Sequence, residues 1–140
     1  MLLPLSLIYG LGVLLRNFLF FLGVLRERKF DIPTIGIGNL AVGGTGKTPL
    51  VEYMIATLQE DGLLPAVVSR GYKGSADGVV VLSENHTAQE VGDEPQQIKR
   101  KFPGIPVIVG KSRVAAIQRV EAEMPRVDVV LLDDAFQHRY

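Results

Sequence analysis

TIGIGNLAVGGTGKT, residues 34–48, is the stretch that decides how the rest of the chain is interpreted. It begins with a short β-branched run that predicts a buried strand, and the residues after Gly46 have the spacing of a helix. Between the two lies a glycine-rich loop that ends in Gly46, Lys47 and Thr48. A strand, a glycine-rich loop and a helix in this order are the context in which a phosphate-binding loop works.

The loop has the residues needed to bind a nucleoside triphosphate. Glycines let backbone N–H groups approach an anion closely, and the start of the following helix adds partial positive charge. Lys47 is expected to reach the β- and γ-phosphates, and Thr48 to place its hydroxyl on Mg²⁺. The alternative is a flexible loop with an incidental lysine. The expected nucleotide-binding residues are Ala41, Val42, Gly43, Gly44, Thr45, Gly46, Lys47 and Thr48.

After residue 31, short apolar runs alternate with longer stretches of helical spacing. Strands buried on both faces are predicted at 34–39, 66–71, 79–82, 106–110 and 127–134. Helices are predicted at 46–61, 89–101 and 111–124, and Gly62 is placed to end the first of them. This alternation predicts an α/β fold like that of P-loop NTPases, with a parallel sheet, right-handed crossovers and flanking helices. Ligands bind at the carboxyl ends of the strands in such sheets.

Composition narrows the possible functions. The chain has 140 residues, which favours one main domain. Its 15 basic and 15 acidic residues balance, so nothing suggests a nucleic-acid partner. It contains no cysteine, which excludes disulfides, zinc-thiolate sites and thiol catalysis.

The N-terminal segment differs sharply from the rest. Arg16 is the only charged residue among residues 1–25, and a largely basic cluster follows at 26–29. This order is the reverse of a secretory signal. A charge in the middle of a spanning helix costs at least about 2.5 kcal/mol. We therefore predict that 1–29 form an apolar helix lying in the membrane interface, and that 30–140 form the nucleotide-binding domain. A spanning helix, or a helix packed on the soluble domain or a second chain, are the alternatives.

An acidic pair ends the last predicted strand, VDVVLLDD. Asp133 or Asp134 is expected to hold Mg²⁺ directly or through water, and the sequence does not distinguish between them. The alternative is that the two carboxylates cap the next turn.

The segment VGDEP, residues 91–95, is the candidate for acting on a phosphate acceptor. Asp93 has the chemistry of a general base for an acceptor hydroxyl, or of a metal ligand. The alternative is structural: Asp93 caps a helix, with Glu94 and Pro95 in its first turn.

Basic and polar residues follow other predicted strands. Arg70, in SRGY, is placed to clamp a phosphate, with a surface salt bridge as the alternative. Lys111 and Arg113 are weaker candidates of the same kind. His138 follows the acidic pair and lies after a strand expected to face the nucleotide.

Together these segments resemble the tetraacyldisaccharide 4′-kinase family, which acts in lipid A biosynthesis in Gram-negative bacteria. The resemblance includes the N-terminal apolar segment with its basic border. It rests on GNLAVGGTGKTP, VVSRGYKG, VGDEP, VIVGKSR and DDAFQHR, in this order and spacing. It implies transfer of the ATP γ-phosphate to the 4′-hydroxyl of a tetraacylated glucosamine disaccharide 1-phosphate, at the cytoplasmic face of the inner membrane.

The resemblance also implies roles for individual residues. ATP and Mg²⁺ are the expected cofactors, and the acylated disaccharide and the membrane surface are the expected partners. The implied catalytic residues are Lys47, Asp93, Asp133 and Asp134, and the implied metal ligands are Thr48, Asp133 and Asp134. The implied substrate contacts are Arg70, Tyr72, Gln137 and His138. Because members of the family are much longer, the chain is expected to be a fragment or the product of a truncated gene, with little activity alone.

Two other classes of function remain open from the sequence. One is another membrane-associated P-loop NTPase, such as a GTPase or a partition-type ATPase. The N/T-K-x-D motif of guanine readers is not found in these 140 residues, and Ala41 and Val42 stand where partition ATPases usually carry a lysine. The other is a fragment that binds ATP without turnover.

Overall fold

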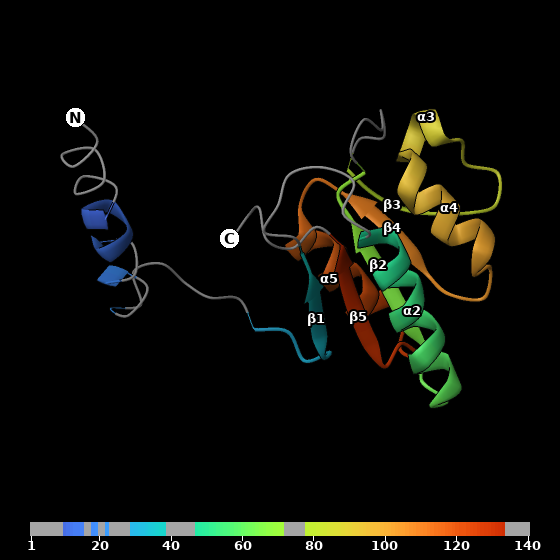
Figure 1. The fold of residues 1–140 in the computed structure, drawn as a ribbon, viewed down its shortest axis with the longest axis horizontal. Coiled ribbons are helices and arrows are strands. Elements are labelled where there is room, and N and C mark those ends of the chain that lie inside the picture. Colours follow the sequence, from blue (N-terminus) through green and yellow to red (C-terminus); the bar gives the residue numbers. More distant parts are fainter. Residues whose placement is uncertain are drawn as a thin grey trace. The chain divides into compact units, whose positions relative to one another are not determined.

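The structure, a computed structural model, describes residues 10–15, 18–19, 22, 29–38, 47–71 and 78–133. The chain divides into two compact units, Met1–Lys29 with Tyr140, and Phe30–Arg139. The larger unit is a mixed α/β structure in which helices flank one sheet (Figure 1).

The sheet has five strands in the order β1-β5-β2-β4-β3. The parallel strands are β1 (Thr34–Ile37), β5 (Val129–Asp133), β2 (Pro65–Ser69) and β4 (Val107–Gly110). All five predicted strands are present, with ends shifted by a few residues. Strands β2 and β4 are buried along their whole length, as expected for nearly continuous apolar runs covered on both faces, whereas only Ile37 of β1 is buried.

The edge strand β3 (Val79–Val81) runs antiparallel to β4, so the prediction of a wholly parallel sheet is wrong there. The physical reason is the length of the connection. A parallel crossover needs a dozen or more residues, usually including a helix. Only the short segment from Arg70 to Gly78 joins β2 to β3. Strand β3 therefore begins near the carboxyl end of β2 and runs in the opposite direction.

The described part of the larger unit has four helices beside this sheet: α2 (Lys47–Glu60), α3 (Ala88–Val91), α4 (Asp93–Lys101) and α5 (Arg113–Glu123). The helix predicted at 89–101 is two helices, because Gly92 interrupts it with φ 95° and ψ 154°. That backbone conformation is essentially restricted to glycine. The predicted helices 46–61 and 111–124 correspond to α2 and α5.

Gly62 ends α2 as predicted. It adopts a positive φ of 77°, and its N–H donates to the carbonyl of Gln59 at 3.0 Å. The next amide, of Leu63, donates to the carbonyl of Leu58 at 2.9 Å. This pair of bonds is the Schellman motif, which satisfies carbonyls that the end of a helix leaves open.

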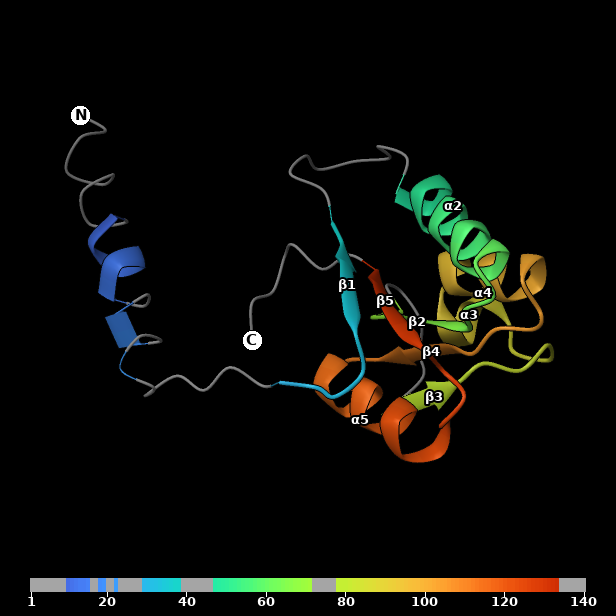
Figure 2. The same ribbon diagram turned by 90° about the horizontal axis from the view of Figure 1, so that it is seen from below.

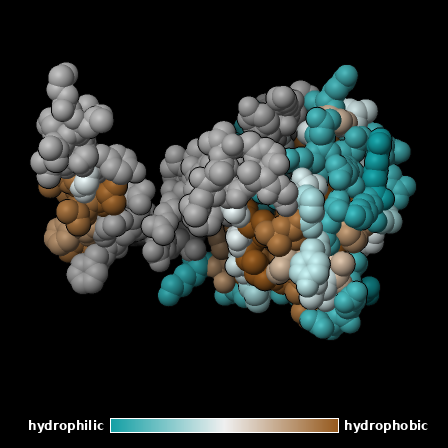
Figure 3. All heavy atoms as spheres, in the orientation of Figure 1, coloured by the Kyte–Doolittle hydropathy of each residue, from teal (hydrophilic) through white to brown (hydrophobic). Residues whose placement is uncertain are grey.

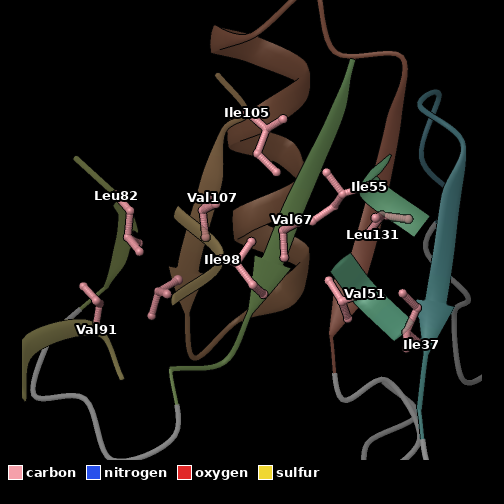
Figure 4. Packing of buried hydrophobic residues seen from close by; sticks show 11 residues of the cluster. Ile37, Val51, Ile55, Val67, Leu82, Val91, Ile98, Ile105, Val107 and Leu131 are labelled. Atoms are coloured by element: carbon pink, nitrogen blue, oxygen red, sulfur yellow. The ribbon is translucent and has the colours of Figure 1, made fainter. Parts of the chain in front are cut away.

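The core lies on both faces of the sheet. Figure 2 shows α2 and α4 over one face and α5 over the other. Side chains alternate along β2, so that Val67 packs beneath α2 and α4 while Ala66 and Val68 pack beneath α5. Figure 4 shows the first of these clusters, in which Val51 and Ile55 of α2 meet the sheet. This two-sided packing holds the strand ends at fixed positions relative to the helix starts.

The larger unit also exposes apolar side chains. Figure 3 shows them gathered over β1, β5 and α2. Ile35 of β1 and Leu50 and Tyr53 of α2 are among the large hydrophobic residues that are exposed.

In the N-terminal unit, residues 10–15 are helical. Five large apolar side chains among its described residues are more than half exposed, namely Leu11, Leu14, Leu15, Phe18 and Leu22. Within the described part of the chain, no helix combines the length and the apolar character needed to cross a bilayer. Arg16 lies outside the described residues, and the membrane-associated helix stays a prediction.

Candidate active site

Strand register brings the candidate residues to one edge of the sheet. Ile37, the last residue of β1, pairs with Asp133, the last residue of β5. On the other side of β5, Leu132 pairs with Val68 of β2, so Ser69 comes next to Asp133. The carboxyl ends of parallel strands are where α/β sheets bind ligands, and the candidate site lies there.

Asp133 is a buried carboxylate, with 4% of its surface exposed. The hydroxyl of Ser69 donates to its Oδ2 at 3.4 Å. Arg113, the first residue of α5, donates from Nη2 to the backbone carbonyl of Asp133 at 3.3 Å. A carboxylate is costly to bury unless it has polar partners, and the hydroxyl of Ser69 is one such partner. Arg113 binds the backbone of the same residue. These contacts also fix the direction in which β5 ends.

Ser69 was not singled out from the sequence, although it belongs to SRGY. The sequence signal that could have identified Ser69 is a hydroxyl residue at the end of an otherwise apolar strand. Arg113, a weak candidate from the sequence, is brought to the end of β5. Its helix is started by Ser112, whose hydroxyl accepts a bond from the amide of Ala115 at 3.3 Å.

Helix α2 opens with Lys47 and Thr48, which are both half-buried. The first turn carries no acidic residue, so no carboxylate within it offsets the positive end of the helix dipole. Pro49 is the third residue, where the N–H that proline lacks would have no partner inside the helix anyway. The sequence thus starts a helix whose first turn suits an anion.

Arg70 is exposed immediately after β2, and Gly71 follows it with a φ of 70°. A Cβ at Gly71 would lie 2.3 Å from Cγ1 of Val109 and 3.1 Å from the carbonyl oxygen of Val91. The chain therefore passes close to β4 and α3 at this point, a contact that local sequence pattern does not predict.

Asp93 is the first residue of α4, and its side chain is exposed. The N-cap position belongs to Gly92, so the alternative that Asp93 caps the helix is wrong by one residue. Glu94 and Pro95 lie in the first turn, as that alternative expected. The carboxylate of Asp93 therefore stands at the start of a helix on the same face of the sheet as α2.

Lys111, a weak candidate from the sequence, is exposed directly after β4. The other candidates lie outside the described residues. They are Ala41 to Gly46 of the glycine-rich loop, and Tyr72, Asp134, Gln137 and His138. Among the residues that the structure describes, no group of three or more His, Cys, Asp or Glu side chains is placed to hold a metal ion.

Comparison with known proteins agrees with this arrangement. The family model for tetraacyldisaccharide-1-P 4′-kinase (LpxK) matches residues 1–140. The tetraacyldisaccharide 4′-kinase of Phocaeicola vulgatus is 51% identical over 139 residues, which are 98% of this chain and 38% of the relative. That of Porphyromonas gingivalis is 51% identical over 138 residues, covering 97% of this chain and 38% of the relative. The chain thus spans about two-fifths of the length of these relatives.

A solved structure is also similar. The crystal structure of LpxK from Aquifex aeolicus in complex with ATP superposes with a TM-score of 0.79 and 34% sequence identity. The match covers 99% of this chain and 44% of that one. The resemblance inferred from the motifs is confirmed, and the chain belongs to the tetraacyldisaccharide-1-phosphate 4′-kinase family.

Proposed function

We propose that the protein transfers the γ-phosphate of ATP to the 4′-hydroxyl of a tetraacylated glucosamine disaccharide 1-phosphate, a step of lipid A biosynthesis. The observation that carries this proposal is the pairing of Ile37 with Asp133. It puts the end of β5 beside the strand that leads to Lys47 and Thr48. Membership of the family supplies the chemistry of the acceptor.

The residues present suit ATP and Mg²⁺. Lys47 and the acid-free first turn of α2 suit the β- and γ-phosphates, together with the proposed loop residues 41–46. The hydroxyl of Thr48 and a carboxylate of Asp133 or Asp134 suit Mg²⁺, which prefers oxygen ligands. When bound, the metal neutralises negative charge on the transferring phosphate. The buried position of Asp133 favours a fixed direction for its carboxylate.

Asp93 is proposed as the general base. Its exposed carboxylate at the start of α4 accepts the proton of the 4′-hydroxyl as that oxygen attacks the γ-phosphorus. A bond forms between the sugar oxygen and phosphorus, the bond between phosphorus and the bridging oxygen breaks, and ADP leaves. Arg70, exposed after β2, is proposed to contact a phosphate, with Tyr72, Gln137 and His138 as further substrate contacts.

Replacing Asp93 with asparagine tests the role of the base. The amide keeps the size of the side chain but cannot accept the proton, so kcat is expected to fall about 10²-fold. ATP binds through other residues, so its Kd is expected to stay within about twofold of the original. Steady-state transfer and equilibrium ATP binding would be measured on the same preparations. Unchanged kcat, or a loss confined to ATP affinity, would remove Asp93 from this role.

The N-terminal unit is proposed to hold the enzyme on the cytoplasmic face of the inner membrane, as a peripheral or monotopic attachment. The support is its set of exposed apolar side chains, spaced at three, four and seven residues in Leu11, Leu14, Leu15 and Phe18. That spacing is typical of one face of a helix. The basic border at 26–29 suits an anionic surface.

Replacing Leu14 and Phe18 together with aspartate is expected to weaken binding to anionic phospholipid vesicles by at least about tenfold, because each side chain buries apolar area worth about 2 kcal/mol. Vesicle flotation measures this. Replacing the buried Ile117 of α5 with valine is the control, because it leaves the N-terminal unit intact. Flotation that is equally strong in the double variant would rule out this attachment.

A further inference from the structure

Two helices of the larger unit begin with residues of the proposed reaction. Helix α2 begins with Lys47 and Thr48, and α4 begins with Asp93. Both lie on the same face of the sheet (Figure 2). The distance between the proposed base and the proposed phosphate site therefore depends on how α4 lies relative to α2.

Glu52, in the second turn of α2, joins the two helices. Its Oε1 accepts a hydrogen bond from Nε2 of Gln97 at 3.1 Å, and its Oε2 pairs with Nζ of Lys101 at 2.5 Å. Gln97 and Lys101 are four residues apart, so they lie on one side of α4 in successive turns. One carboxylate thus contacts α4 at two points, which sets both the position and the direction of that helix.

This contact differs from an ordinary surface ion pair. The side chain of Glu52 is only 13% exposed, although Lys101 is 56% exposed. The hydrogen bond from Lys101 holds the pKa of Glu52 below its ordinary value, burial opposes that shift, and the bond from Gln97 supports it. Partial burial reduces screening by salt. The pair of Arg119 and Glu123, by contrast, lies within α5 and is exposed on both sides.

Other polar contacts of α4 reach different parts of the chain. Nε2 of Gln96 donates to the carbonyl of His86 at 2.7 Å. Nζ of Lys99 donates to the carbonyls of Pro103 and Ile105 at 2.8 and 2.9 Å. These bonds tie α4 to the segments before and after it, whereas Glu52 ties it to α2. Apolar packing between the helices is non-directional and does not fix their register in the same way.

We propose that Glu52 is a positioning residue, which sets where Asp93 lies relative to Lys47 and Thr48; the inference rests on the proposed function. Glu52 is roughly 7.5 Å along α2 from Lys47, and Gln97 is roughly 6 Å along α4 from Asp93. The contact between Glu52 and Gln97 therefore lies at a similar distance from the first residue of each helix. A misplacement of about 1 Å at reacting groups can cost about 10²-fold in rate.

The test compares Glu52→Gln, Lys101→Glu and the double variant Glu52→Lys with Lys101→Glu. The double variant restores the ion pair with reversed charges, and the amide of Gln97 can turn its oxygen toward the new lysine. Glu123→Gln is the matched control, because it breaks an ion pair within one helix. The intact protein is used for kcat, for KM of ATP and for amide hydrogen exchange in the first turns of α4.

We expect kcat to fall about tenfold in Glu52→Gln and at least as far in Lys101→Glu, with KM for ATP within about twofold. The double variant is expected to recover most of the loss, and Glu123→Gln to match the original. Amide hydrogen exchange in α4 is expected to be faster in the single variants and to return to the original rate in the double variant.

Unchanged kcat in Glu52→Gln, or a double variant as slow as the singles, would overturn the inference. Absence of transfer by the unaltered protein would count against the proposed function instead. Amide exchange then decides the inference alone, and equal exchange in α4 with and without Glu52→Gln would overturn it.

Discussion

Replacing Lys47 with alanine is expected to lower phosphate transfer by at least about 10³-fold while leaving the fold intact. Lys47 is the first residue of α2 and brings a full positive charge to the helix start proposed to face the β- and γ-phosphates. Removing a group that stabilises charge in the transition state costs about 10²–10³-fold, and this group also holds the nucleotide. Alanine is the best helix former, so α2 is expected to persist.

The effect would be measured as kcat/KM for transfer, with circular dichroism melts to confirm folding. Arg126→Ala is a suitable control. Arg126 is exposed in the turn before β5, at the other end of the sheet from Asp133. Loss of that charge is expected to change kcat/KM less than about twofold. If Lys47→Ala kept most of the original activity, the role proposed for the start of α2 would be wrong.

Replacing Gly71 with alanine is expected to destabilise the fold by about 2–5 kcal/mol. Its φ of 70° costs an alanine about 1–2 kcal/mol. The new Cβ would also lie 2.3 Å from Cγ1 of Val109 and 3.1 Å from a backbone oxygen, so β4 or the chain itself must shift. Overpacking of this kind costs about 1–3 kcal/mol. Valine has one rotatable side-chain bond and little freedom to move away.

Gly78→Ala separates the two contributions. Gly78 has a similar φ of 79°, but no atom of the described residues lies within 4 Å of the position that a Cβ would take there. The alanine variant at this position is therefore expected to show the backbone cost alone. Urea unfolding of both variants and of the original protein gives the two free energies. Equal losses at Gly71 and Gly78 would contradict the close approach to Val109.

Much of the fold follows from local sequence pattern. The β-branched runs predicted all five strands, because β-branched residues favour strands. Two of these strands, β2 and β4, are buried along their whole length. Gly62 predicted the end of α2, because few other residues adopt a positive φ. The direction of β3 did not follow, because it depends on the short connection after β2. The break at Gly92 was missed because a single glycine inside a helical pattern is often tolerated.

The site was less predictable than the fold. Lys47 and Asp133 could be predicted as site residues from local sequence. The glycine-rich loop marks the start of the helix that carries Lys47, and the acidic pair marks the end of the strand that carries Asp133. The bond between Ser69 and Asp133 joins residues 64 apart, and the contact of Glu52 with Lys101 joins residues 49 apart. Such contacts depend on strand order and helix packing, which local pattern does not contain. Sequence also favoured Asp93 as an N-cap, since aspartate is common there, and the unusual backbone of Gly92 moved the helix start by one position.

The most direct test of the proposed function is transfer of label from γ-labelled ATP with Mg²⁺ to tetraacyldisaccharide 1-phosphate in detergent micelles. The intact protein and its Lys47→Ala variant would be compared, and the labelled position on the sugar identified by NMR. The proposed function predicts a product phosphorylated at the 4′-oxygen, formed by the original protein and not by the variant. Absence of that product, or equal formation of it by both proteins, would contradict the proposed function.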